Sequence, residues 1–352
     1  MVHYIRFLKP PKLDIQKCIV RALVTITTDL GDDFYPADIG LYAAVINDAS
    51  KESDTEWERI LWKRGTRNAW IEIRKTQFED TGSMRLLVST QSTLAADTVF
   101  LSNLPEILSA RCEVFRKEKP QAGDRVERRY RTSLGNQRAI YEDTGESIAR
   151  HIWDAGIALT AFLSDIVLQP QQSSLVASVL TKTKSYRPGV LELGSGCGIV
   201  GLEIAQICSQ CDVILTDLPD AMENLSYNVS KVMGSNLAVG NVVTAVLDWD
   251  DANPKIMQGH RYDLVIVSDC TYNADSIPAL VRKLAAVIDE WPAALIVVSM
   301  KVRHDSEAVF FDLMAAAGFI IAEHSAITLP DQQRADSGQE LEVVDIYVFG
   351  SN

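Results

Sequence analysis

The sequence predicts an α/β protein whose C-terminal part is a doubly wound, mainly parallel, seven-stranded sheet, preceded by an N-terminal α+β region. Two observations carry this prediction. From Arg187 onward, short apolar runs alternate with stretches of helical periodicity, as in a succession of βα units. The first of these runs leads directly into a glycine-rich turn and a helix, over residues Val190–Gly201. A turn of this kind is typical of ligand-binding α/β sheets.

The length and composition agree with a packed protein of about two domains. The chain has 352 residues, of which 47% are hydrophobic and 23% charged, the usual range for globular proteins. Its 34 basic and 47 acidic residues give a net charge of −13. Because such a charge repels phosphate backbones, we expect no nucleic-acid partner.

Targeting and redox signals point to the inside of the cell. The N-terminus lacks a basic region followed by an apolar stretch, and no run of about 18 apolar residues suggests a membrane span. The six cysteines are scattered, and the pair Cys208 and Cys211 has no second ligand pair nearby, so we expect reduced thiols and no metal. We therefore expect a protein without a membrane partner, located in the cytoplasm, with the nucleus as an alternative.

The N-terminal region, assigned to residues 1–142, reads as a mixture of strands and helices. Alternating or β-branched segments predict strands at Ala22–Thr28, Trp70–Arg74 and Met84–Thr90. Residues Arg125–Asp143, with Gly135-Asn136 between two runs, predict a hairpin. We expect this region to recognise a substrate or to cover the second domain, assigned to residues 143–352.

The second domain is expected to contain seven strands with helices between them. Apolar runs place the strands at Val190–Leu193, Asp212–Thr216, Val242–Leu247, Leu264–Val267, Ala294–Ser299, Phe319–His324 and Leu341–Phe349. Helical patterns place the helices at Val200–Ile207, Pro219–Met233, Ser276–Glu290 and Asp305–Ala317. Because no helix separates the last two strands, they are expected to form an antiparallel hairpin at the sheet edge.

The glycine-rich turn after the first strand is the most informative motif. Glycines let the backbone approach a ligand closely, and the N-terminus of the following helix offers unpaired N–H groups. Gly196, Gly198 and Gly201 also satisfy the G-x-G-x-x-G pattern, with Asp217 about 20 residues further on, as in dinucleotide-binding sites. A nicotinamide-dependent oxidoreductase is therefore one alternative.

Three further features favour a different ligand. Glu192, within the first strand, suits a cation such as a methionyl ammonium better than a pyrophosphate. Asp217 ends the second strand, where a carboxylate can accept hydrogen bonds from both hydroxyls of a ribose. Asp248-Trp249 ends the third strand and offers an acid and a flat aromatic ring for an adenine. All three lie at or near the carboxyl edge of the predicted sheet, where open α/β sheets bind ligands.

With two more motifs, the chain resembles the seven-strand S-adenosylmethionine-dependent methyltransferases. Asp269-Cys-Thr-Tyr272 follows the fourth strand, and Trp153 lies in the segment His151–Leu159 upstream of the glycines. In order and spacing these motifs are similar to those of the protein lysine methyltransferases that modify elongation factors and chaperones. The resemblance covers about Ile152–Phe349 and implies a Rossmann-like methyltransferase sheet with S-adenosyl-L-methionine as cofactor.

The resemblance also implies roles for individual residues. The residues implied to bind the cofactor are Trp153, Glu192, Gly194, Ser195, Gly196, Asp217, Leu218, Asp248, Trp249 and Ser268. Among them, Gly194, Ser195 and Gly196 would contact the methionyl part, Asp217 the ribose, and Asp248 and Trp249 the adenine. Trp153 would pack on the cofactor and Ser268 would line the pocket. Asp269 and Tyr272 would face the methyl-accepting nitrogen as catalytic residues.

The chemistry of these two residues fits transfer to an amine. A lysine attacks a methyl group only when it is neutral, so the site must desolvate it and orient its lone pair. An aspartate can steer the amine by hydrogen bonding, and a tyrosine ring can form an apolar wall. Direct displacement of this kind requires no metal.

These features predict a protein-lysine N-methyltransferase that acts on a folded protein partner. The run Asp269–Leu280 and the long N-terminal region look similar to fungal enzymes that modify translation elongation factor 2. Besides the oxidoreductase, two alternatives remain: a small-molecule N- or O-methyltransferase, and a non-catalytic adaptor that retains the fold. The methylated lysine, the number of methyl groups and the oligomeric state stay open.

Overall fold

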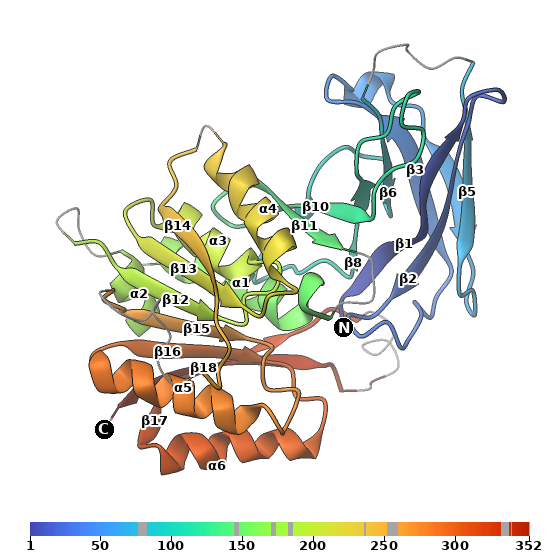
Figure 1. Ribbon diagram of the computed structural model, residues 1–352. Helices are drawn as coiled ribbons and strands as arrows, with labels where there is room; N and C mark the ends of the chain where they lie inside the picture. The colour runs from blue at the N-terminus through green and yellow to red at the C-terminus, as the bar shows by residue number, and fades with distance from the viewer. Residues whose placement is uncertain are drawn as a thin grey trace.

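The computed structural model describes residues 1–76, 83–143, 148–169, 174–181, 186–235, 237–251, 260–331, 338 and 340–351. It contains two parts that lie against each other (Figure 1). We call the part built from β1 to β11 the β domain, and the part from α1 to β18 the α/β domain.

The β domain contains two sheets. Its strands are β1 (His3–Asp14), β2 (Ile19–Thr27), β3 (Ile39–Ile46), β4 (Glu58–Trp62), β5 (Ala69–Arg74), β6 (Arg85–Ser89), β7 (Asp97–Thr98), β8 (Ile107–Leu108), β9 (Ala110–Cys112), β10 (Arg125–Arg131) and β11 (Gln137–Asp143). One sheet has the order β5-β2-β1-β8. The other has the order β11-β10-β9-β6-β3-β4, with β7 paired to β10.

The expected α+β character of this region is corrected to all-β. Among residues 1–76 and 83–143, the structure contains strands and the 3₁₀ turn η1 (Glu52–Asp54), but no α-helix. Apolar residues there recur at every second position, as at Val20, Ala22, Val24 and Ile26, and this period buries one face of a strand. The predicted hairpin is confirmed as β10 and β11, joined through Gly135 at φ +84°.

The α/β domain contains the predicted seven-stranded sheet. Its strands are β12 (Gly189–Leu193), β13 (Asp212–Asp217), β14 (Asn241–Val246), β15 (Leu264–Ser268), β16 (Leu295–Met300), β17 (Phe319–Thr328) and β18 (Val343–Ser351), in the order β14-β13-β12-β15-β16-β18-β17. The first five are parallel, and β18 runs antiparallel to both β16 and β17. The predicted terminal hairpin is confirmed, with β17 at the edge.

Helices cover both faces of this sheet. The helices are α1 (Asp154–Leu168), α2 (Leu175–Leu180), α3 (Ile199–Ile207), α4 (Met222–Met233), α5 (Ile277–Glu290) and α6 (Val309–Ala316), with 3₁₀ turns η2 (Ile148–Arg150) and η4 (Asp305–Ala308). Residues of β12 alternate between two cores: Val190 packs in the core with α1 to α4, and Leu191 in the core with α5 and α6. The connection between β14 and β15 includes residues 252–259, which lie outside the described residues.

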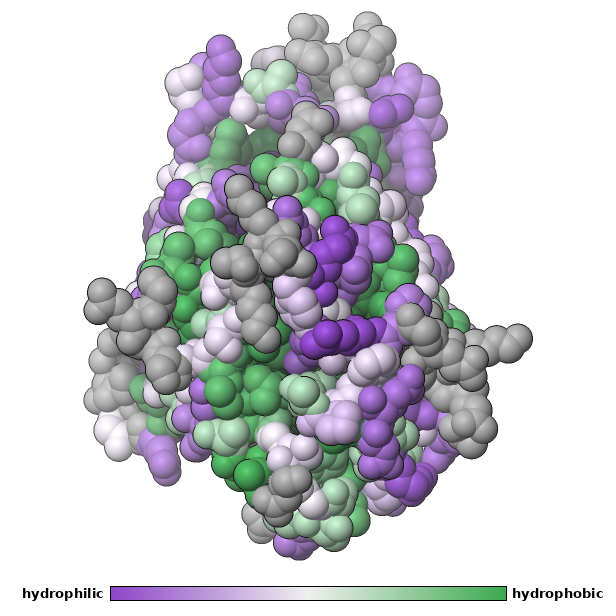
Figure 2. Space-filling view, turned by 90° about the vertical axis from the view of Figure 1, so that its left-hand side faces the viewer, coloured by the Kyte–Doolittle hydropathy of each residue, from purple (hydrophilic) through white to green (hydrophobic). Residues whose placement is uncertain are grey.

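Helix α1 is long, apolar and buried along most of its length. The stretch Ile148–Leu168 is long and apolar enough by composition to cross a membrane, but 72% of its most apolar window is buried inside the fold. It therefore has the character of a core helix of a packed domain. On the face of the molecule shown in Figure 2, hydrophobic residues form small patches between hydrophilic ones.

One hydrophobic cluster extends across both domains. Val2 and Tyr4 of the β domain are fully buried in the same cluster as the residues of α1. The hydroxyl of Tyr4 donates to Oδ1 of Asp154 at 2.8 Å, and Nε of Arg138 in β11 donates to Oε2 of Glu203 in α3 at 3.2 Å. The β domain is thus packed against α1 and α3.

Candidate active site

A cavity of about 750 Å³ opens at the carboxyl ends of β12 to β15. All twelve residues predicted for the site line it: Trp153, Glu192, Gly194, Ser195, Gly196, Asp217, Leu218, Asp248, Trp249, Ser268, Asp269 and Tyr272. The parallel strands bring all of them except Trp153 together, because the carboxyl ends of the strands meet at one sheet edge, and Trp153 comes from the segment before the helix Asp154–Leu168. Their individual roles stay predictions. Sequence reasoning missed Ile148 and Ala149, which form another wall.

The glycine loop leaves no space for side chains on its inner side. Gly194 has φ +67°, and a Cβ atom there would lie 2.5 Å from Sγ of Cys270 and 3.2 Å from the ring of Trp249. Gly196 has φ +55°, and its Cβ would lie 3.2 Å from the carbonyl oxygen of Ala149. Glycine is therefore required twice, for backbone conformation and for close approach. The hydroxyl of Ser195 is used within the protein, where it accepts from the N–H of Thr216 at 3.1 Å.

Asp217, at the end of β13, organises the loop. Its Oδ2 accepts from the N–H of Gly196 at 2.6 Å and its Oδ1 from the N–H of Leu218 at 2.7 Å. Each carboxylate oxygen can accept a second hydrogen bond, so this arrangement leaves acceptor sites for two hydroxyls. Burial raises the pKa of Asp217, against the effect of these two N–H groups.

Glu192 is fully buried beneath the same loop. Its Oε2 accepts from the N–H of Gly201, in the first turn of α3, at 3.1 Å. Burial raises the pKa of this carboxyl to about 8. A cationic group brought into the cavity would favour the ionised form, so the environment fits an ammonium. Contact between Glu192 and such a group stays a prediction.

The end of β14 supplies the rim on the expected adenine side. The Trp249 ring is partly buried and packs close to Gly194. Asp248 is exposed, and its Oδ1 accepts from the N–H of Asp250 at 3.0 Å. Leu218 is also exposed at 47%. This part of the cavity therefore combines an aromatic face with a solvent-accessible carboxylate.

Trp153 and Ser268 also line the cavity. Trp153 immediately precedes α1, and its Nε1 donates to the carbonyl oxygen of Ile148 at 3.3 Å. The guanidinium of Arg303 lies over its ring, 5.5 Å from the centroid. Ser268 ends β15, and its hydroxyl accepts from the hydroxyl of Ser299 at 2.9 Å. Both side chains are thus fixed by neighbouring strands and loops.

Asp269 and Tyr272 differ in their surroundings. Asp269 is buried, has φ +54°, and forms an ion pair through both carboxylate oxygens with Arg303, each at 2.7 Å. A non-glycine residue in this conformation is uncommon and is often found at functional sites. Tyr272 is 53% exposed at the mouth of the cavity, so its ring is a rim and not an enclosed wall.

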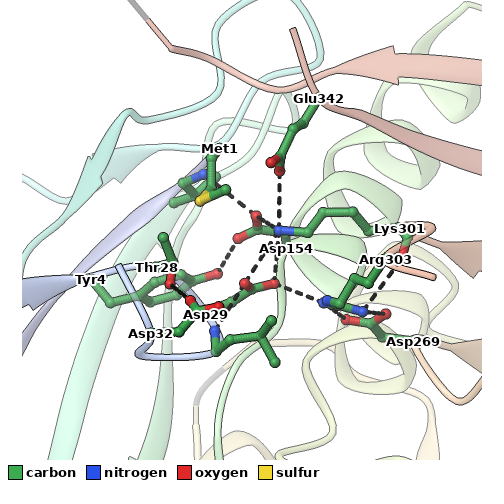
Figure 3. A network of polar contacts seen from close by, with 12 residues as sticks. Met1, Tyr4, Thr28, Asp29, Asp32, Asp154, Asp269, Lys301, Arg303 and Glu342 are labelled. Atoms are coloured by element: carbon green, nitrogen blue, oxygen red, sulfur yellow. Dashed lines mark hydrogen bonds and ion pairs between the residues drawn. The ribbon is translucent and has the colours of Figure 1, made fainter. Parts of the chain in front are cut away.

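A buried polar network behind Asp269 was not predicted (Figure 3). Nζ of Lys301 lies 2.8 Å from Asp154 Oδ2, 3.2 Å from Asp29 and 3.3 Å from Glu342. Lys301 and Arg303 were visible in the sequence as basic residues after a strand. Their partners gave no signal, because Asp29 lies 272 residues from Lys301 along the chain.

The network changes the proton affinities of its members. Burial raises the pKa of Asp154 to about 6, Asp29 adds to this effect, and Lys301 opposes it. For Asp29, burial is outweighed by the charges of Lys301 and Arg303, which lower its pKa. For Lys301 and Arg303, burial is outweighed by the carboxylates, so the pKa of each is raised. Both basic groups are therefore charged at neutral pH.

The cavity fits S-adenosylmethionine in its chemistry. Glu192 offers a buried acid for an ammonium, Asp217 offers acceptors for hydroxyls, and Trp249 offers a face for a purine. Gly194 lines this space with backbone atoms alone, and a Cβ there would meet Cys270 and Trp249.

Comparison with known proteins agrees with this chemistry. Residues 135–317 match the sequence profile of a family described as lysine methyltransferase. A protein of Schizosaccharomyces pombe named UPF0665 family protein C23C4.06c is 27% identical over 335 residues, 93% of this chain and 97% of that protein. The protein-lysine N-methyltransferase rrg1 of the same yeast is 38% identical over 144 residues, 37% of this chain and 44% of that protein.

A third relative extends over most of both chains. The Homo sapiens protein-lysine N-methyltransferase EEF2KMT is 24% identical over 277 residues, covering 72% of this chain and 83% of the human protein. The family match includes more than half of the chain, from β11 to the end of α6. The protein described here therefore belongs to the lysine methyltransferase family and is an S-adenosylmethionine-dependent enzyme.

Proposed function

We propose that this enzyme methylates a lysine of a folded translation elongation factor, and that elongation factor 2 is its substrate. The supporting observation is the extent of the similarity to the human enzyme EEF2KMT. That alignment covers 72% of the chain, whereas residues 143–352 make up about 60% of it. The alignment therefore includes part of the β domain, and not the α/β domain alone.

The open mouth of the cavity supports a macromolecular acceptor. Three apolar side chains at its lining are exposed to solvent: Ile148 at 56%, Leu218 at 47% and Tyr272 at 53%. A site built for a small molecule usually encloses most of its ligand, whereas an exposed apolar rim suits a protein surface. An elongation factor acts in translation, so we place the enzyme in the cytoplasm.

The residues of the site would divide the work between binding and positioning. When bound, S-adenosylmethionine supplies an activated methyl group. Asp217 and the loop Gly194–Gly196 would hold the cofactor, while Asp269 would accept an N–H of the acceptor amine and direct its lone pair. The exposed ring of Tyr272 would pack on the alkyl chain of the lysine. Positioning of two reactants supplies most of the acceleration in such a displacement.

Calorimetry with S-adenosylmethionine tests the cofactor site first. Asp217→Ala should lower the affinity at least ~10-fold, because a carboxylate that accepts two hydroxyls is lost. Asp212→Ala is the matched control, since Asp212 begins the same strand and pairs with Arg187 at the surface. Equal affinities for both variants would contradict the assigned role of Asp217.

Labelled methyl transfer tests the substrate. The enzyme is incubated with tritiated S-adenosylmethionine and purified elongation factor 2 or elongation factor 1A, and the modified residue is located by mass spectrometry. We expect a methylated lysine in elongation factor 2. Labelling of elongation factor 1A alone, or of neither factor, would contradict this assignment.

A further inference from the structure

Arg303 joins two parts of the molecule that are far apart in sequence. It lies in the loop between β16 and η4, and its Nη1 and Nη2 contact the two carboxylate oxygens of Asp269 at 2.7 Å. The same Nη2 lies 2.8 Å from Oδ2 of Asp29, in the loop after β2 of the β domain. Figure 3 shows both carboxylates directed at this one guanidinium. The side chain of Arg303 is 15% exposed, and those of Asp29 and Asp269 are almost fully buried.

Asp29 is itself fixed from several sides. Its Oδ1 accepts from Nζ of Lys301 at 3.2 Å and from the N–H of Leu30 at 2.9 Å. Its backbone carbonyl accepts from Nη2 of Arg6 in β1 at 2.8 Å. The carboxylate is therefore a rigid anchor that the β domain presents to Arg303.

We propose that Arg303, anchored by Asp29 of the β domain, is a positioning residue that orients Asp269 and makes the acceptor site selective for a neutral lysine amine. The inference rests on the proposed methylation of a protein lysine and adds to it the part that the β domain takes in the reaction. The β domain then supplies a component of the active site in addition to any role in substrate recognition.

The geometry of the ion pair allows Asp269 to bind a substrate at the same time. A carboxylate has about four acceptor positions, and the two bonds from Arg303 use one position on each oxygen. The remaining positions can accept an N–H of the lysine. Because the fork of the guanidinium is planar, it also fixes the plane of the carboxylate.

The charge of Arg303 decides which form of the lysine is favoured. An unpaired carboxylate next to the amine would stabilise the ammonium, which has no lone pair for attack. Arg303 compensates the charge of Asp269, so the neutral amine costs less to form. The lysine proton would leave to solvent before transfer. The nitrogen lone pair would then form the new N–C bond to the methyl carbon as the S–C bond breaks, and the electron pair of that bond would leave with the thioether sulfur of S-adenosylhomocysteine.

Other charged and titratable groups around the pair come from several elements. Asp154 of α1, Lys301 at the end of β16 and Glu342 before β18 form ion pairs among themselves. Tyr272 follows Asp269 at the cavity mouth, and Oε1 of Glu307 accepts from the backbone N–H of Arg303 at 2.9 Å. If Arg303 is removed, Asp269 loses its basic partner, whereas Asp29, Asp154 and Glu342 keep their ion pairs with Lys301.

The test compares steady-state methylation by full-length variants over pH 6.5–9.5, with elongation factor 2 as acceptor. Arg303→Met should lower kcat by ~10–100-fold and shift the acidic limb of the kcat profile upward by about one pH unit, since the bound lysine then holds its proton more tightly. Arg303→Lys, which keeps the charge, should restore the limb but not the full kcat. Asp29→Asn keeps the charge of Arg303 and removes one carboxylate beside it, so the limb should not move upward, whereas kcat should fall because Arg303 loses its anchor.

A matched control separates this role from simple domain docking. Nη2 of Arg125 in β10 and Oε1 of Glu223 in α4 form another ion pair between the domains, at 2.5 Å and outside the cavity. Glu223→Gln should leave kcat and its pH profile unchanged. Affinity for S-adenosylmethionine, measured by calorimetry, should change less than about threefold in every variant, since Arg303 does not line the cavity.

Two outcomes would overturn the inference. If Arg303→Met lowers activity only in proportion to the folded fraction, with an unchanged acidic limb, Arg303 is purely structural. The same holds if Glu223→Gln shifts the limb equally. If elongation factor 2 is not labelled, the substrate proposal fails separately, and the variants are compared on the proteins that wild-type enzyme labels in a cell extract. A wild-type enzyme that labels no protein contradicts both.

Discussion

Gly194 in the glycine loop meets two requirements at once, a positive φ and the absence of a side chain. The substitution Gly194→Ala adds a Cβ that would meet Cys270 and Trp249 and imposes φ +67° on a residue with a side chain. We expect the free energy of unfolding to fall by about 1–3 kcal/mol and the affinity for S-adenosylmethionine to fall at least ~10-fold. Chemical denaturation and calorimetry measure the two effects.

Gly135 provides the control for backbone strain alone. It has φ +84° in the hairpin between β10 and β11, and a Cβ there meets no atom within 4 Å. Gly135→Ala should lower stability by about 1 kcal/mol and leave the affinity unchanged. If both glycine variants bound the cofactor equally, the loop would not form the floor of its site.

The sequence predicts the site residues that lie at the ends of strands. Asp217, Asp248 and Asp269 each follow an apolar run, and parallel strands place such residues together. The sequence did not reveal that Asp269 is paired. Its partner Arg303 lies 34 residues away, and the next partner, Asp29, lies a further 274 residues from Arg303 in the other domain. No local pattern encodes a contact of that separation.

At the scale of elements, strand β1 contains a histidine that should make stability depend on pH. His3 is 5% exposed, its Nδ1 has no hydrogen-bond partner in the described part of the chain, and its ring packs edge-on against Tyr35. Burial, together with the N-terminal ammonium, lowers its pKa to about 4. The folded state therefore keeps His3 neutral, whereas the unfolded chain binds a proton near pH 6.5.

The sign of the effect follows from this difference. Between pH 6.5 and 4 the unfolded state binds more protons, so the free energy of unfolding should fall by about 1–3 kcal/mol as the pH is lowered through this range. His3→Gln should remove this part of the pH dependence. Urea denaturation at pH 7 and pH 5 compares the two proteins, and an identical loss in both would show that His3 is not responsible.

The contact between β11 and α3 depends on a buried charge. Glu203 is fully buried, and its carboxylate accepts from Arg138 at 3.2 Å, from Ser164 at 2.8 Å and from Thr132 at 3.1 Å. Arg138→Met should lower the free energy of unfolding by about 3–5 kcal/mol, because it leaves a buried carboxylate without its cation. Arg187→Met, at an exposed pair with Asp212, should cost less than about 1 kcal/mol. Similar losses for both variants would mean that burial does not decide the effect.

The elements of the α/β domain were predictable because their strands are buried on both faces. β15 reads as an apolar run that ends at Ser268, β12 is interrupted only by Glu192, and glycines mark where the chain leaves the sheet after β12. The β domain contains strands as short as β7 and β8, with two residues each, and pairs them across long sequence distances. Such strands leave no periodic signal, so their sheets could not be derived from the sequence.

For the whole molecule, the hydrophobic cluster that both domains share predicts that the α/β domain does not fold stably without the β domain. Removal of residues 1–142 would take Arg138 from Glu203, Tyr4 from Asp154 and Asp29 from Lys301, and would expose the apolar face of α1. We expect the truncated protein to aggregate or to unfold without a cooperative transition. Size-exclusion chromatography and thermal denaturation measure this. A monomeric fragment that binds S-adenosylmethionine with wild-type affinity would show that the domains are independent.

The insertion of β18 between β16 and β17 has a consequence for the time at which the enzyme matures during synthesis. Arg303 is made 274 residues after Asp29, and β18, which completes the sheet between β16 and β17, is made after both. In a chain that is still attached to the ribosome after β17 has emerged, β18 is missing from its place between β16 and β17. Strand β16 then lacks its partner on that side, and Arg303 lies in the loop just after β16. An incomplete copy of the protein, released before Val343, would therefore carry every residue of the cavity and still lack the support that holds them in place.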